Sequence, residues 1–237
     1  FISLLVYKDD IPASFVPDKT TRQFRKICRH WRAISEIITD IKIRMRWILN
    51  QHNFPGPLNI TGDSARRWFL GQGHLLDTTS SFTFSQFLVS IEHLELQQLP
   101  IRRQILQFSD MPQFKDDILL FKTVPGIADI ISAIIIAEVA GFNRFHDAEA
   151  IACYTGLTER TRESAGRRTQ GHISSSGPET LRWALCEAAL CLIRSDPTYR
   201  AIYNRIFNHS RNKGKAKVAM ARKLITWLWK MHQTREP

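Results

Sequence analysis

The stretch that decides the fold is DKTTRQFRKICRHWRAISEIITDIKIRMRWILN, residues 18–50. Its apolar side chains recur at steps of three and four, which is the spacing of one face of an α-helix. We therefore predict one long helix from Asp18 to Asn50. Basic side chains fill many remaining positions, so that face either follows nucleic-acid phosphates or is simply solvated. The apolar positions are Phe24, Ile27, Trp31, Ile34, Ile38, Ile41, Met45 and Ile48; the basic ones are Arg22, Arg25, Lys26, Arg29, Arg32, Lys42, Arg44 and Arg46.

A second long apolar row predicts a partner for this helix at residues 84–108. Thr83 and Gln86 fit a capping box at its start, and Pro100 inside it should kink or split it. A loop and a short helix at about 63–71 separate the two rows. Two long amphipathic helices joined in this way predict an antiparallel helical hairpin or coiled coil.

Two apolar helices within residues 115–141 flank the turn Val-Pro-Gly-Ile-Ala at 124–128. This arrangement resembles a helix-hairpin-helix module, in which backbone N–H groups of the turn contact a phosphate without reading bases. Gly126, Ile127 and Ala128 are then candidate phosphate contacts. The usual second glycine is replaced by Ala128, and the alternative interpretation is a tight helix–helix corner.

Further helices follow at about 146–156 and 179–194. Another helix should begin at Asp196-Pro197, with Asp196 as its N-cap and Pro197 as its first residue. The stretch 211–223, RNKGKAKVAMARK, holds six basic residues and no acidic one, and it leads into a last helix. It is a candidate phosphate-binding segment, because cations near a helix N-terminus oppose the helix dipole. The candidate contacts are Arg211, Lys213, Lys215, Lys217 and Arg222.

A polar stretch interrupts these helices within IACYTGLTERTRESAGRRTQGHISSSGPETLRWAL, residues 151–185. Ser164 lies there in what we predict to be a loop, since hydrophobic periodicity is absent. A hydroxyl among fixed positive charges suits attack on a phosphodiester, which guanidinium groups grip bidentately. His172 is a candidate proton donor or phosphate ligand, or only a loop residue. The arginines around the serine are Arg160, Arg162, Arg167 and Arg168.

A helix should begin directly after this loop. Ser176 is the predicted N-cap, Pro178 lies in the first turn, and Glu179 completes a capping box. The glycines around the loop allow sharp turns and close backbone approach.

The pattern Y-x-G-L, then a serine, then G-x-I-S-x-x-G-x-x-x-L-R-x-A-L resembles the C-terminal domain of the insertion-sequence one-ten family of transposases. These proteins are bridge-RNA-guided serine recombinases. The resemblance implies that Ser164 is the nucleophile and forms a phosphoserine link to DNA. It also implies DNA and a guide RNA as partners. In the family a helical insertion, which corresponds here to the predicted helical hairpin, mediates contacts between subunits, so the resemblance implies a homo-oligomer as well. The matching residues are Tyr154, Gly156, Leu157, Ser164, Gly171, Ile173, Ser174, Gly177, Leu181, Arg182, Ala184 and Leu185.

In that family a nuclease domain of the RuvC type precedes the helical insertion and supplies the carboxylates for a divalent metal such as Mg²⁺. Residues 1–17 resemble the end of such a domain, and Asp9 and Asp10 do not match its metal ligands. We therefore expect no metal ligand in this sequence, and we expect it to be the C-terminal part of a longer protein that is inactive alone. The predicted domains are this stub at 1–17, the helical hairpin at 18–110 and the transposase domain at 115–237.

Composition agrees with a globular nucleic-acid-binding protein: 43% of residues are hydrophobic, the net charge is +11 and the pI is about 9.9. The four cysteines form no C-x-x-C pair, which predicts free buried thiols in a reducing compartment. The longest apolar run, residues 127–140, is too short to span a bilayer. We expect an all-α protein of the bacterial cytoplasm, at the nucleoid, without a membrane partner.

Two other functions stay open. A non-catalytic nucleic-acid-binding module needs only the basic surfaces, and its salt-sensitive binding would survive Ser164→Ala. A helical assembly domain would act through the two long helices and would form an oligomer with little affinity for nucleic acid.

Overall fold

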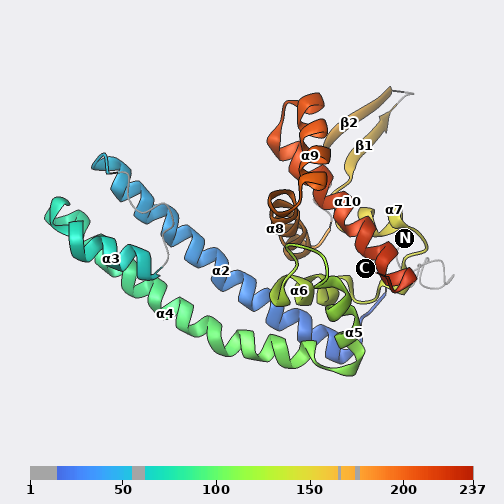
Figure 1. Ribbon diagram of the computed structural model, residues 1–237, viewed down its shortest axis with the longest axis horizontal. Coiled ribbons are helices and arrows are strands. Elements are labelled where there is room, and N and C mark those ends of the chain that lie inside the picture. Colours follow the sequence, from blue (N-terminus) through green and yellow to red (C-terminus); the bar gives the residue numbers. More distant parts are fainter. Residues whose placement is uncertain (1–14, 55–61, 165–166, 174–176, 237) are drawn as a thin grey trace, which may run out of the picture.

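The computed structural model describes residues 15–54, 62–164, 167–173 and 177–236, and for 159–173 it gives the backbone. Helices dominate these residues, which confirms the all-α prediction, and a two-stranded antiparallel sheet is added to them. Figure 1 shows a long helical hairpin that extends away from a compact helical domain. The predicted nuclease stub, with Asp9 and Asp10, lies almost wholly outside the described residues.

The hairpin consists of α2 (Lys19–Gln51) and α4 (Thr78–Ser109), which run antiparallel. Asp18 caps α2 by accepting a hydrogen bond from the Thr21 N–H, so the predicted helix is confirmed within a residue at each end. The α4 helix continues through Pro100, so the alternative in which the proline splits it is wrong. Figure 1 shows a smooth curve along this helix instead.

The start of α4 differs from the predicted one. Asp77 is its N-cap and accepts hydrogen bonds from the Thr79 and Ser80 N–H groups, six residues before the predicted capping box. The Thr83 hydroxyl donates to the Thr79 carbonyl, as in a helix interior. The polar residues up to Ser81 indicate a break in the sequence, but the Asp77 side chain satisfies two free N–H groups and so allows the helix to begin there.

The far end of the hairpin has its own small core. Met45 and Leu49 of α2 pack with Phe84 and Leu88 of α4. The short α3 (Gly62–Gln72) and η1 (Gly73–Leu75) cover this end, where the Phe69 ring stacks on Phe84 at 5.5 Å. The predicted short helix is thereby confirmed.

The near end of the hairpin belongs to the main core. The helices of the compact domain are α5 (Pro112–Phe121), α6 (Asp129–Val139), η2 (Phe142–Arg144), α7 (Ala148–Tyr154), α8 (Glu179–Ser195), α9 (Pro197–Ser210) and α10 (Lys213–Thr234). The α6 helix lies at the centre, because every residue from Ser132 to Val139 is buried. It contacts α2 and α4 on one side and α8 on the other. The hairpin and the compact domain thus share one hydrophobic core.

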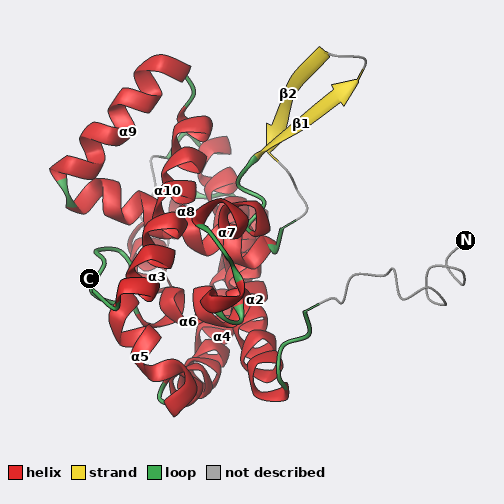
Figure 2. Ribbon diagram, turned by 90° about the vertical axis from the view of Figure 1, so that its right-hand side faces the viewer, coloured by secondary structure: helices red, strands yellow, loops and turns green. Residues whose placement is uncertain are grey.

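The polar stretch predicted as a loop is a β-hairpin, with β1 at Glu159–Ser164 and β2 at Arg167–Ile173. Figure 2 shows the two strands projecting from the helical body. An antiparallel pair is held by backbone hydrogen bonds, so its residues need not alternate between apolar and polar. This is why hydrophobic periodicity did not reveal the strands.

Two smaller expectations are corrected as well. Pro178 is at the N-cap of α8, which begins at Glu179, and no side chain of the described residues caps that helix; Ser176, the predicted N-cap, lies outside the described residues. Of the four free cysteines, Cys28 is buried, whereas Cys153 and Cys191 are exposed. No helix in the described part of the chain is long and apolar enough to cross a membrane.

Candidate active site and nucleic-acid interface

The β-hairpin leaves the helical body through a tight backbone neck. The outgoing leg is Thr155–Leu157 at the end of α7, where all three residues are buried and Gly156 has a positive φ of 69°. The returning leg is Gly177, which is followed by Pro178 and then by α8. A Cβ at position 177 would lie 2.5 Å from the Gly156 nitrogen and closer still to the carbonyl carbon and oxygen of Thr155. Only glycine allows the two legs to touch in this way.

Side-chain hydrogen bonds hold both legs of the neck. The Thr155 hydroxyl donates to the Ala152 carbonyl and accepts from the Leu157 N–H. On the other leg, Arg182 of α8 reaches back and donates to the Gly177 carbonyl over 2.6 Å. Each leg is therefore tied to the helix that adjoins it.

Beyond the neck, the strand register places Ser164 at the tip of the hairpin. Ser164 pairs with Arg167, Glu163 with Arg168, and Arg162 with Thr169. Paired residues of an antiparallel ladder share one face, and faces alternate along each strand. Ser164, Arg162 and Arg167 therefore occupy positions on one face, and Arg168 occupies the other.

Near the base of the hairpin the register shifts. Glu159 pairs with Ile173 while Thr161 pairs with Gln170, so β2 carries one extra residue opposite Arg160. The extra residue falls at Gly171 or His172, and a bulge of this kind increases the local twist. His172 is thus a strand residue close to the neck, away from Ser164 at the tip.

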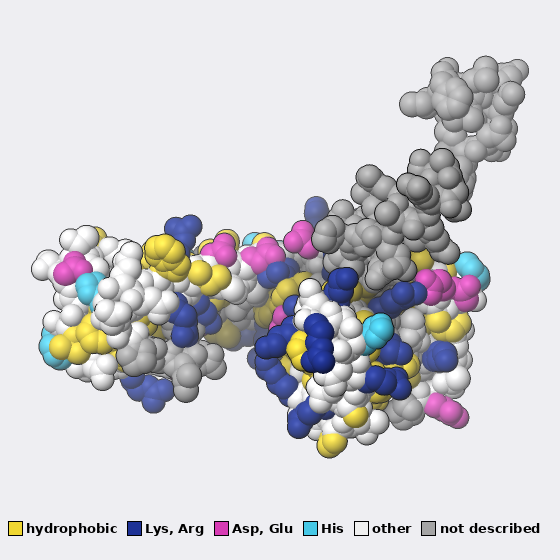
Figure 3. All heavy atoms as spheres, turned by 90° about the horizontal axis from the view of Figure 1, so that it is seen from above, with side chains coloured by type: hydrophobic (Ala, Val, Ile, Leu, Met, Phe, Trp, Pro, Cys, Tyr) yellow, Lys and Arg dark blue, Asp and Glu magenta, His cyan; other side chains and the backbone are white. Residues whose placement is uncertain are grey.

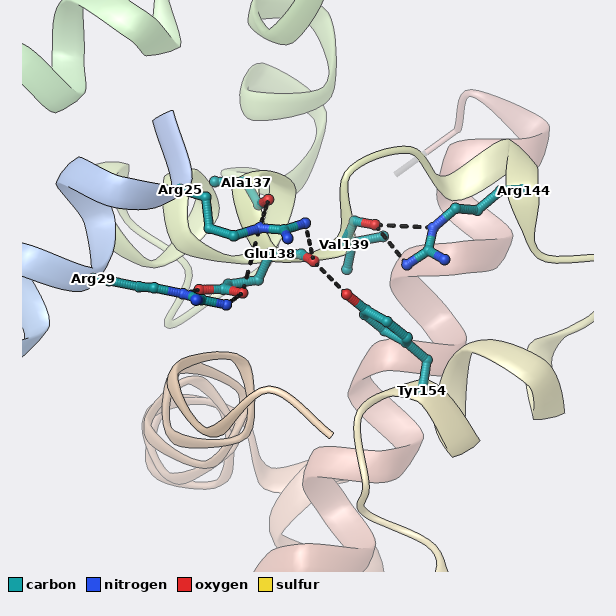
Figure 4. Close-up of polar contacts among 7 residues, drawn as sticks. All are labelled: Arg25, Arg29, Ala137, Glu138, Val139, Arg144 and Tyr154. Atoms are coloured by element: carbon teal, nitrogen blue, oxygen red, sulfur yellow. Dashed lines mark hydrogen bonds and ion pairs between the residues drawn. The ribbon is translucent and has the colours of Figure 1, made fainter. Parts of the chain in front are cut away.

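A buried polar cluster lies behind the neck, at the C-terminal end of α6. Glu138 is completely buried, and Arg29 of α2 donates to both of its carboxylate oxygens at 2.6 and 2.8 Å. The Tyr154 hydroxyl, one residue before the neck, donates to the Glu138 carbonyl at 2.9 Å. Figure 4 shows how α2, α6 and α7 meet at these three residues.

Two more arginines complete the cluster. Arg25 donates to the carbonyls of Ala137 and Glu138 at 3.0 and 3.1 Å, and Arg144 donates twice to the Val139 carbonyl. The last carbonyls of a helix lack partners within it, and cations there interact favourably with the helix dipole. This end of α6 is therefore well satisfied, and the Arg144 guanidinium also stacks 4.3 Å over the Tyr154 ring.

These contacts change the interpretation of the basic face of α2. Arg25 and Arg29 are committed to Glu138 and the end of α6, and Arg32 pairs with Glu36 and lies 4.3 Å over the Trp183 ring. On the half of α2 nearest the compact domain, these arginines therefore mainly connect α2 to the compact domain. Other cations of α2 are exposed, such as Lys26 in the near half and Arg44 in the far half.

The candidate helix-hairpin-helix turn packs inward. Gly126 has φ +92°, and a Cβ there would lie 2.6 Å from the Cys191 Cβ on α8. Ile127 is buried, and Ala128 is the N-cap of α6 without a side-chain cap. Asp129 in the first turn of α6 is paired with Lys122 at 2.6 Å, which puts a carboxylate where a phosphate would bind. The geometry favours the helix–helix corner.

The basic segment at the start of α10 is well placed for an anionic partner. Arg211, Lys213 and Lys215 are exposed, and Asn212 caps the helix by accepting from the Lys215 N–H. Figure 3 views the side on which α9 and the β-hairpin lie in Figure 1, and it shows Lys and Arg side chains gathered on the compact domain. The other two candidates are less free: Lys217 is half-buried beside Cys186, and Arg222 is paired with Glu149 at 2.7 Å.

No group of three or more His, Cys, Asp or Glu residues that could hold a metal ion occurs within the described ranges. Burial raises the pKa of the Cys186 thiol, although Lys217 and Arg182 partly offset the effect.

Sequence reasoning missed the residues that build the support of the hairpin. Glu138 lies in a run of apolar residues, where a lone carboxylate requires a partner if it is buried. That signal could have been used. Its partners Arg25 and Arg29 could not be identified, because they are more than 100 positions away in the sequence.

A search of the curated proteins finds no match to the chain. A family model matches residues 119–204, which run from the end of α5 into α9 and include the neck, the hairpin and α8. Over these residues the chain is similar to the transposase family described as IS116/IS110/IS902, and this match supports a role in DNA transposition or recombination with DNA as the partner.

Proposed function

We propose that the compact domain is the DNA-cleaving domain of a serine-dependent, RNA-guided transposase, with Ser164 as the nucleophile. The observation that carries this proposal is the strand register, which pairs Ser164 with Arg167 at the tip of a projecting hairpin. A residue at such a tip reaches a DNA backbone without the helical body in the way. The family match over the whole hairpin supports the same assignment.

The proposed reaction is a transesterification in two steps. The Ser164 hydroxyl loses its proton and forms a bond to phosphorus, while the bond from phosphorus to one deoxyribose oxygen breaks and that oxygen takes up a proton. A hydroxyl of the partner strand then attacks the phosphoserine and releases Ser164. The covalent intermediate divides one difficult step into two and conserves the phosphodiester.

Arginines supply the positive charge that this chemistry needs. Arg162 and Arg167 occupy the face of the ladder on which Ser164 lies, so we assign to them the charge that develops on the phosphate oxygens. The positive charge of these guanidinium groups also favours the alkoxide form of the serine. Arg160 and Arg168 contribute to DNA affinity rather than to the reacting phosphate.

A divalent metal is expected from the family, but the described residues provide no group that fits one. The proposal therefore derives no step through a metal from this chain. The guide RNA would select the DNA by base pairing, so the protein itself need not read base edges. The exposed cations at the start of α10 suit either nucleic acid, since both present phosphates.

The test is covalent capture of DNA. The full-length protein is incubated with guide RNA and end-labelled target DNA and separated on a denaturing gel. We expect a shifted, protease-sensitive band for the wild type and for Ser195→Ala, a serine that lies at the end of α8. The band should vanish with Ser164→Ala. An adduct that persists in Ser164→Ala would show that the nucleophile is another residue.

A second role is favoured by the far end of the helical hairpin. Trp47, Leu70 and Phe82 are 65%, 78% and 65% exposed, although they are large and apolar. A groove of about 370 Å³ between α2 and α4 adjoins Trp47. We propose that this end contacts another subunit, because apolar surface of this kind is usually covered. Light scattering should show a smaller particle for Trp47→Glu than for Lys42→Glu, and equal masses would argue against the contact.

A further inference from the structure

Among the described residues, the neck is the main connection between the β-hairpin and the helical body, so the direction of the neck sets the position of the tip. The strands β1 and β2 pair with each other, and neither makes extensive contact with a helix. The outgoing leg reaches β1 after Thr158, and the returning leg ends at Gly177. A change of direction at the neck would swing Ser164 at the opposite end of the hairpin by a larger distance.

Two contacts restrict the direction of the neck. On the returning leg, Gly177 touches the backbone of Thr155 and Gly156, which leaves no room for a Cβ. On the outgoing leg, the hydroxyl of Tyr154 is fixed on the Glu138 carbonyl, and its ring packs 5.4 Å from that of Phe145. The first contact sets the spacing of the legs and the second anchors them to α6.

The anchor itself is rigid. Glu138 is completely buried, and Arg29 donates two hydrogen bonds to its carboxylate. The backbone carbonyl of Glu138 accepts hydrogen bonds from both Arg25 and Tyr154. Charge-assisted, bidentate hydrogen bonds fix direction as well as distance. The cluster in Figure 4 thus connects α2 of the helical hairpin to the base of the β-hairpin.

We propose that Gly177 and Tyr154 are positioning residues that fix the direction of the β-hairpin and thereby the place of Ser164. This inference rests on the proposed function for its consequence in catalysis, but the geometry of the hairpin can be measured without any reaction. Reactivity depends steeply on such placement, since a shift of about 1 Å can lower a rate by as much as about 10²-fold.

The first experiment measures the direction of the hairpin. Cys153, Cys186 and Cys191 are replaced by Ser, and the substitutions Ser164→Cys and Lys230→Cys supply the two sites for nitroxide labels. Lys230 is exposed on α10, within the helical body. Pulsed electron paramagnetic resonance on the otherwise intact chain then gives the distribution of distances between the two labels, and we expect one narrow peak.

Gly177→Ala should shift or broaden this peak, because the added Cβ meets backbone that has nowhere to move. Tyr154→Phe removes one hydroxyl and should broaden the peak while the protein remains folded. Gly71→Ala, with open space around its Cβ, is the matched control and should leave the peak unchanged. If Tyr154→Phe and every folded form of Gly177→Ala retain the narrow peak, the neck does not position the hairpin.

The second experiment follows the consequence for chemistry. In the DNA-capture assay with full-length protein, Tyr154→Phe should lower the rate of adduct formation at unchanged DNA affinity and unchanged unfolding midpoint, whereas Gly71→Ala should match the wild type. A purely structural role would lower the midpoint instead and leave the rate intact. Absence of any adduct from the wild type would refute the proposed function, and the distance measurement would still decide the role of the neck.

Discussion

Arg167 and Arg168 are neighbours in sequence, but their positions in the ladder differ. Arg167 pairs with Ser164 and Arg168 pairs with Glu163, so the two arginines occupy opposite faces. We expect Arg167→Ala to slow adduct formation by on the order of 10²-fold, as when one charge-stabilising donor is lost. Arg168→Ala should reduce DNA affinity by the same amount as Arg167→Ala but should change the rate much less. Equal rate losses for the two variants would mean that the register does not select the catalytic arginine.

His232 makes a separate prediction about pH. Its ring is buried against Phe142, and burial lowers its pKa, although Asp117 nearby partly raises it and Arg235 lowers it further. The unfolded chain therefore takes up a proton at a higher pH, near 6.5, than the folded one. The contribution of neutral His232 to the free energy of unfolding should therefore be fully present above about pH 6.5. It should be lost as the pH drops through the pKa of His232 in the folded protein.

Thermal unfolding between pH 7.5 and 5 measures this effect. His232→Gln should flatten the loss of stability over that window, and His146→Gln, which changes an exposed side chain, should keep the wild-type slope. A His232→Gln protein that loses stability as steeply as the wild type would assign the pH dependence to other groups.

At the scale of elements, periodic apolar residues were sufficient to predict the helices. The two long helices, the short helix between them and the restart at Asp196 are all present. The early start of α4 was missed because Asp77 precedes a polar turn, and capping is a local contact that periodicity does not register. The β-hairpin was missed because its strands are polar on both sides of the ladder, so they follow no apolar pattern.

The corner between α5 and α6 shows how one element can fit two functions in sequence and only one in space. A glycine turn between apolar helices is typical of a phosphate-binding hairpin, but Gly126 lies against Cys191 and Ala188 of α8. Gly141 also has a positive φ, of 108°, and open space around it. It therefore provides a control for backbone strain alone.

We expect Gly126→Ala to lower the free energy of unfolding by about 1–3 kcal/mol more than Gly141→Ala does, which is the usual cost of overpacking. Chemical denaturation measures this difference, and DNA binding by the folded Gly126→Ala protein should match the wild type. A stable Gly126→Ala protein with weakened DNA binding would support the phosphate-binding interpretation of the turn.

At the scale of the whole molecule, the sequence indicated a basic protein but not how its charge is used. The cations of α2 nearest the compact domain serve as a joint, since Arg25 and Arg29 hold Glu138 and Arg32 stacks on Trp183. Those near the start of α10 have no comparable partner in the described structure. The net charge therefore predicted an anionic partner. Which cations remain available for that partner depends on ion pairs between residues far apart in the sequence, and no local sequence pattern reveals those pairs.

This division of charge leads to a prediction about salt. Lys213 and Lys215 are exposed at the start of α10, and Arg44 and Arg67 are exposed on the far half of the helical hairpin. Each pair carries two positive charges, so replacing either pair by alanine changes the net charge equally.

Each cation that contacts a phosphate releases a counterion, which contributes about 0.9 to the slope of log affinity against log salt on duplex DNA. The lysine double variant should therefore reduce the slope by about 1.8, and the arginine double variant should leave it unchanged. Fluorescence anisotropy with labelled duplex at several salt concentrations measures both slopes. If the two variants reduce the slope equally, duplex DNA contacts the helical hairpin as well, and the interface extends beyond the compact domain.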